Sequence, residues 1–108
     1  MAIWKAEFIA FGKGAPQATA SLTVEDLGSG SATGTLRNFR GPVSMTELDL
    51  GGVVQGATFI LAGSGQQLGI HLSLHFSPFV SAFAGSARIV LHESQRVLEL
   101  FVITSPSE

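Results

Sequence analysis

Cysteine is absent from this sequence of 108 residues, and charged residues are scarce. The lack of cysteine excludes disulfides, thiolate chemistry and cysteine-ligated zinc. Asp, Glu, Lys and Arg make up 13% of the chain, about half of the roughly 25% that is typical of globular proteins. Six basic and eight acidic residues leave a net charge of −2. Because these charges are spread thinly, we expect no binding to nucleic acid.

Long apolar runs are missing as well. The sequence has no stretch of about 18 apolar residues, which is the length that a membrane-spanning helix needs. Near the N-terminus, Lys5 and Glu7 interrupt the segment in which a signal peptide would have its apolar core. We therefore expect a soluble chain without a membrane span and without a signal peptide.

Short segments of alternating hydrophobicity make up most of the chain. Residues 18–25 show the pattern most clearly, with Ala, Ala, Leu and Val on one face and Thr, Ser, Thr and Glu on the other. An alternation of period two is typical of a half-buried strand. Thirteen glycines and other turn residues recur about every 8 to 12 residues, which indicates an antiparallel barrel or sandwich.

We therefore predict one all-β domain over residues 1–108, with eight short antiparallel strands closed into a small β-barrel. A two-sheet β-sandwich is the alternative. Closure is favoured because it removes exposed sheet edges. The tail from about Thr104 is expected to fray.

Turn residues divide the predicted strands. We expect strands at residues 3–11, 18–25, 31–36 and 43–50, and a fifth strand that ends near residue 62. Three more strands are expected, one after each of the turns at 63–67, 77–81 and 92–96. Residues 37–42 are expected to form a loop. Residues 50–53, Leu-Gly-Gly-Val, fit a two-residue hairpin turn, because consecutive glycines tolerate positive φ angles.

The strands of the second half permit a prediction of register, because inward residues must face inward residues across each hairpin. Leu61 is expected to face Ile70, and Ile89 is expected to face Leu100. The other face of these strands would then carry a row of four residues: Ile60, His71, Arg88 and Phe101. Glu99 would lie diagonal to Arg88.

Three polar residues of this second face are the candidate catalytic residues. His71, Arg88 and Glu99 together could bind an acidic ligand or move a proton, although a plain solvent-facing sheet surface is the simpler interpretation. His71 and His75 would lie about 13 Å apart along a strand, too far to share a metal ion. We expect no metal site and no cofactor.

The second face is also unusually apolar near the C-terminus. Such a surface needs cover, which either an apolar small ligand in the lumen or a second copy of the chain would provide. The expected partner is therefore a homo-oligomer or a small apolar ligand. The candidate ligand or interface residues are Ile60, His71, Arg88, Val97, Phe101 and Ile103.

The arrangement of short strands around the hairpin at residues 69–76 resembles small soluble barrels in general, including lipocalin-like, avidin-like and bacterial virulence-associated barrels. This resemblance implies an architecture and no activity. Our leading hypothesis is a non-catalytic barrel that acts as a binding or interaction module, through a homo-oligomer interface or an apolar ligand in the lumen. A lumen-type cyclase or isomerase is the first alternative, and it requires His71, Arg88 and Glu99 to point inward. A secreted effector-like barrel is the second.

Overall fold

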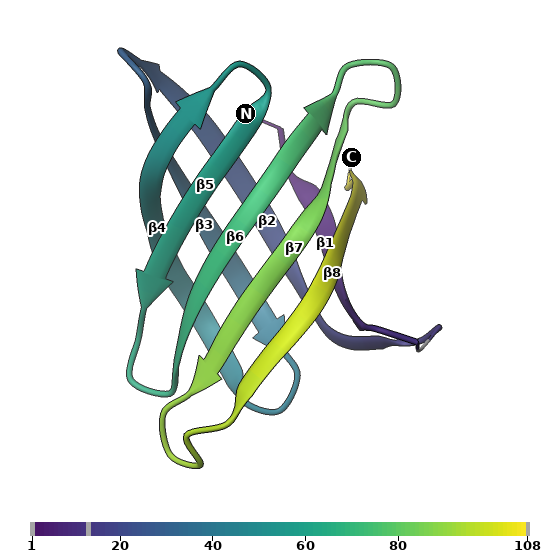
Figure 1. Ribbon diagram of the computed structural model, residues 1–108, viewed down its shortest axis with the longest axis vertical. Coiled ribbons are helices and arrows are strands. Elements are labelled where there is room, and N and C mark those ends of the chain that lie inside the picture. Colours follow the sequence, from purple (N-terminus) through teal and green to yellow (C-terminus); the bar gives the residue numbers. More distant parts are fainter. Residues whose placement is uncertain (1, 13, 108) are drawn as a thin grey trace.

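The computed structural model describes residues 2–12 and 14–107, and within them it contains eight strands and no helix. Each strand pairs with the next in antiparallel orientation, and the last pairs with the first, so the sheet closes into a barrel (Figure 1). The predicted all-β class and the eight-stranded antiparallel barrel are confirmed, and the sandwich alternative is wrong. The strands are β1 (Trp4–Ala10), β2 (Pro16–Gly28), β3 (Ser31–Arg40), β4 (Ser44–Gln55), β5 (Thr58–Ser64), β6 (Leu68–Ser77), β7 (Ala82–Leu91) and β8 (Val97–Pro106).

Pairing between β1 and β8 closes the barrel. The two strands align from Trp4 opposite Pro106 to Ala10 opposite Leu100. The segment from Thr104, which we expected to fray, therefore continues β8. Its composition suggested a loose tail, but its backbone finds partners on β1, which an analysis of local sequence does not reveal.

Side chains fill the interior. Every strand contributes to one cluster of buried apolar residues, and no polar or charged side chain of the described residues is buried. An eight-stranded barrel is just wide enough for side chains to fill it. The rings of Phe8 and Phe39, for example, meet edge to face with their centroids 5.7 Å apart. The interior is therefore a packed core.

Residues 37–42 do not form the expected loop. Strand β3 continues to Arg40, and Phe39 is only 1% exposed. Across the strand pair, Arg37 lies opposite Glu47, and the two side chains form an ion pair of 3.5 Å. The polar residues at 37, 38 and 40 are typical of a loop. In the structure they are exposed on β3, and the residue of this segment that points into the barrel is Phe39.

The predicted inward face of the second half is correct, but two of its registers are wrong. Between β6 and β7 the register is as predicted, with Leu72 opposite Ala87. Leu61, however, faces Leu72 instead of Ile70, and Ile89 faces Leu98 instead of Leu100. Both registers are shifted by two residues, because each turn is centred one residue away from its expected place. Such a shift keeps every side chain on its predicted face and changes only its neighbours.

Two glycines lie where neighbouring strands come closest. A Cβ atom at Gly52 would collide with the carbonyl oxygen of Ile60, and one at Gly85 would collide with the carbonyl oxygen of Ser73. Glycine inside a strand is typical of a sharp bend or a close backbone approach in a barrel. The expected turn at residues 50–53 is therefore wrong: these residues lie within β4, and their glycine pair reflects packing.

Adjacent residues offer a matched test of this packing. Gly52→Ala should lower the free energy of unfolding by about 1–3 kcal/mol, because the new methyl group forces backbone to move. Gly51→Ala should change it by no more than about 0.5 kcal/mol, since no atom lies within 4 Å of a Cβ there. Urea denaturation measures both values, and equal losses in the two variants would contradict the assignment.

Candidate functional site

The two ends of the barrel differ in chemistry. One end carries both chain termini and the turns that follow β2, β4 and β6 (Figure 1). Three apolar side chains are exposed at this end: Phe79 (97%) and Val80 (65%) in the turn after β6, and Leu27 (54%) near the end of β2. At the opposite end, a hollow beside the last turn is lined largely by polar residues, among them Gln66, Glu93 and Arg96. Among the large apolar side chains of the described residues, the most exposed one, Phe79, therefore lies at the end that carries the turn after β6.

A hollow of about 400 Å³ opens at the apolar end, and we call it the mouth. Its walls come from the ends of strands that are far apart in sequence. Asp26 is the only charged residue among those that line it. The mouth is lined by Trp4, Val24, Asp26, Gly56, Ala57, Phe59, Phe76, Pro78 and Phe83.

Four aromatic rings form the base of the mouth, with Phe83 at their centre. The centroid of the Phe83 ring lies 4.9 Å from that of Trp4, 5.0 Å from that of Phe76 and 5.5 Å from that of Phe59. The contacts with Trp4 and Phe59 are edge to face, which is a favourable arrangement of aromatic quadrupoles. Trp4 and Phe83 are buried, whereas Phe59 and Phe76 are partly exposed. The last two therefore offer ring surface to a ligand.

Hydrogen bonds hold the rim of the mouth. The indole Nε1 of Trp4 donates to the carbonyl oxygen of Ser81 at 2.9 Å, which ties the turn between β6 and β7 to β1. On β2, an Oδ1 atom of Asp26 accepts a hydrogen bond of 2.9 Å from the amide of Gly28. This carboxylate therefore stabilises its own turn, as Asp commonly does.

Sequence analysis did not identify the aromatic residues of the mouth as a site. Alternation alone assigns them to the core, because they lie on the inward face. The position of each residue along its strand would have indicated the site. Trp4 begins β1, Phe76 lies near the end of β6 and Phe83 lies near the start of β7. In an antiparallel sheet these three positions meet at one end of the barrel.

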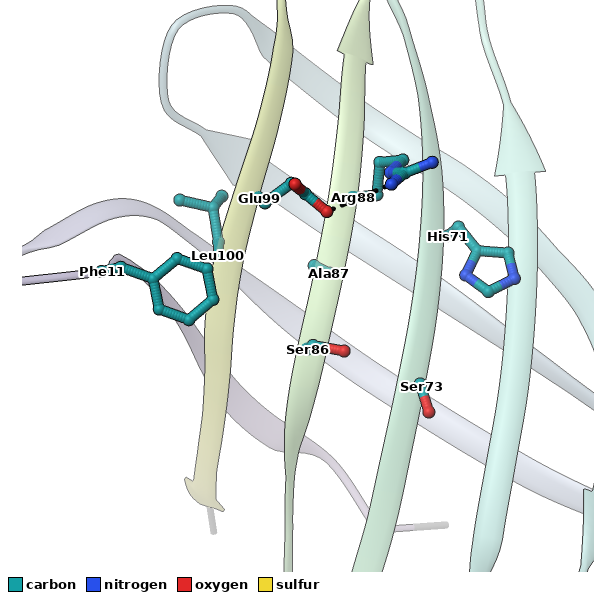
Figure 2. Close-up of a pocket in the computed structure, with 8 residues that line it drawn as sticks. All are labelled: Phe11, His71, Ser73, Ser86, Ala87, Arg88, Glu99 and Leu100. Atoms are coloured by element: carbon teal, nitrogen blue, oxygen red, sulfur yellow. Dashed lines mark hydrogen bonds and ion pairs between the residues drawn. The ribbon is translucent and has the colours of Figure 1, made fainter.

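The predicted candidates His71, Arg88 and Glu99 lie together on the outside of the barrel (Figure 2). They form one row across β6, β7 and β8, with Glu99 directly opposite Arg88 and not diagonal to it. Arg88 Nη2 lies 3.2 Å from Glu99 Oε1, and both side chains are 62% exposed. None of the three points toward the interior.

The apolar candidates also lie on the outer surface, but in different rows. Ile60 pairs with Ser73 and not with His71, and Phe101 pairs with Ser86 and not with Arg88. The two-residue shifts in register explain both differences. Exposure of these candidates is 39% for Ile60, 54% for Val97, 48% for Phe101 and 45% for Ile103.

A shallow hollow of about 460 Å³ lies among these residues, and we call it the outer hollow. Small side chains make up much of it, and Figure 2 shows Phe11 at one margin and His71 at the other. The rings of Phe11 and Phe101 meet edge to face, with centroids 4.2 Å apart. The outer hollow is lined by Phe11, His71, Ser73, Ser86, Ala87, Arg88, Glu99 and Leu100.

Other kinds of site were sought in the described part of the chain. Residues 2–12 and 14–107 contain no cluster of three His, Asp or Glu side chains placed to hold a metal ion. Among the same residues there is no helix long and apolar enough to cross a membrane. Comparisons with protein-family models, with curated proteins and with solved structures gave no match. The mouth and the outer hollow are therefore the features from which a function can be argued.

Neutralising either member of the outer ion pair should have little effect on folding. Arg88→Gln and Glu99→Gln should each lower the free energy of unfolding by no more than about 1 kcal/mol, because exposed ion pairs contribute little in water. Urea denaturation of the single and double variants gives the coupling energy. A coupling of several kcal/mol would show instead that this pair holds the barrel wall together.

Proposed function

We propose that this protein is a non-catalytic binding module whose mouth takes the apolar part of a small ligand. The observation that carries the proposal is a hollow, open to solvent, whose base consists of four aromatic rings. Small-molecule sites are typically concave and mostly apolar, with a few polar groups, and they commonly occupy the mouths of barrels.

The packed interior limits where a ligand can sit. Leu72, Leu74 and Ile89 are fully buried in the core below the mouth, so a ligand in the lumen has no room. The volume of the mouth, about 400 Å³, lies within the range of about 300–1,000 Å³ that is common for such sites. We therefore place the ligand at the end of the barrel, and this refines the lumen hypothesis.

The lining residues disfavour an anionic ligand. None of them is Lys, Arg or His, so an anionic group would find no partner. The turn between β6 and β7 extends apolar surface beyond the rim, because Pro78 lines the mouth and the neighbouring Phe79 is 97% exposed. A ligand longer than the mouth would have its protruding part covered by this turn.

The alternative of a lumen-type enzyme has less support. It needs His71, Arg88 and Glu99 inside the barrel, and all three lie on its outer surface. The one ionisable residue of the mouth, Asp26, is bonded to the amide of its own turn. A lone carboxylate beside aromatic rings lacks the second group that acid–base chemistry commonly uses.

The single tryptophan provides a direct test, because Trp4 lines the mouth. Dansylamide, an uncharged aromatic fluorophore that accepts energy from tryptophan, should bind saturably and quench the emission of Trp4. Ala57→Leu should weaken this binding by roughly ten-fold or more, because the added methylene and methyl groups occupy the mouth and displace ligand contacts.

Ala62→Leu is the matched control. It makes the same change on β5, but on the outer surface of the barrel, and it should leave the affinity for dansylamide unchanged. Absence of saturable binding to the parent protein would contradict the proposal. Equal affinity in the parent and in Ala57→Leu would contradict it as well.

A further inference from the structure

The outward residues of β1, β8, β7 and β6 form a regular grid, which we call the outer wall. The observed registers align these strands row by row. Its rows are Lys5 and Ser105; then Glu7, Ile103, Ala84 and His75; then Ile9, Phe101, Ser86 and Ser73; then Glu99, Arg88 and His71; then Val97, Val90 and Gly69. Phe11, just beyond the end of β1, packs against Phe101.

The two halves of the outer wall differ in size and in charge. On β1 and β8 several outward residues are bulky and apolar, and the ionisable ones are Lys5, Glu7 and Glu99. On β7 and β6 most outward residues are small, and the ionisable ones are Arg88 and two histidines. One half therefore projects and has two carboxylates and one ammonium group, while the other is recessed and carries the guanidinium group of Arg88.

The shape of the wall agrees with this division. The outer hollow lies mostly over the recessed half, where Ser73 and Ser86 leave space, and Phe11 and Glu99 line its other side (Figure 2). On the projecting half, Phe101 is 48% exposed and its ring is supported by the ring of Phe11. A projection thus stands beside a depression of about 460 Å³.

We propose that the outer wall binds a second copy of this chain, about a two-fold axis that runs parallel to the strands between β7 and β8. Such an axis places β8 of each copy over β7 of its partner, while β1 and β6 curve away from the contact because the sheet is closed. Phe101 then faces the partner's Ser86 above the outer hollow, and Ile103 faces the partner's Ala84. Two-fold symmetry makes each contact twice.

The same axis pairs opposite charges, because Arg88 faces the partner's Glu99. A wall that complements itself in both size and charge favours a second copy over an unrelated protein. The neighbouring strands β2, β3 and β4 are less suitable, because their outer surface carries Glu25, Arg37, Arg40, Glu47 and Asp49 among others.

The extent of the wall sets the expected strength. Because the wall is the convex outside of a closed barrel, the contact is centred on β7 and β8. It is therefore smaller than a standard specific interface. We therefore expect a dimer that dissociates in the micromolar range.

Charge reversal tests the proposed axis. Arg88→Glu alone brings two acidic groups together at each of the two contacts with Glu99, and Glu99→Arg alone brings two basic groups together. Each variant should dissociate roughly ten-fold more readily than the parent. In a mixture of the two variants, every contact between copies again joins opposite charges, whereas the repulsion within each chain remains. The mixture should therefore dimerise with nearly the affinity of the parent.

Sedimentation velocity across the micromolar range measures these affinities. Arg37→Glu and Glu47→Arg serve as controls, because Arg37 and Glu47 form a similarly exposed ion pair on β3 and β4; neither should change dimerisation. A parent that stays monomeric would overturn the proposal. So would single variants that dimerise like the parent, or a mixture that dimerises no better than its components.

Discussion

Hydrogen bonding between β1 and β8 is the contact on which the other features of this molecule depend. It closes the sheet, so that each of the eight strands has a neighbour on both sides, and it gathers the inward side chains around one axis. With eight strands the enclosed space is only as wide as its side chains, and here apolar residues fill it. Binding is therefore left to the end of the barrel and to its outer surface.

Closure also builds the mouth. Trp4 lies on β1 opposite Pro106 of β8, and its ring packs against Phe83 on β7. The indole of Trp4 in turn holds the turn between β6 and β7 through the carbonyl oxygen of Ser81. The first strand, the last strand and a distant turn thus meet at one site, which exists only in the closed barrel.

The sequence predicted the strand content, the barrel and the inward residues of the second half, because alternation of period two depends only on which face is buried. It did not predict turn positions such as that near Gly52, where glycine serves close packing and not a turn. When the centre of a turn is displaced by one residue, the pairing of the two strands that it joins shifts by two residues. For this reason the sequence predicts Phe101 opposite Arg88, whereas Phe101 lies opposite Ser86. Alternation does not predict the aromatic site at the mouth, because it identifies which residues face inward but not where they lie along the barrel axis.

The central claim is that a ligand of this barrel sits at the mouth and not within the lumen. Amide NMR spectra recorded during addition of dansylamide test it residue by residue. The account predicts the largest shifts at the indole N–H of Trp4 and at the amides of Ala57 and Phe76, which belong to the mouth. Largest shifts at Leu68 and Leu91, which are buried toward the opposite end, would contradict it.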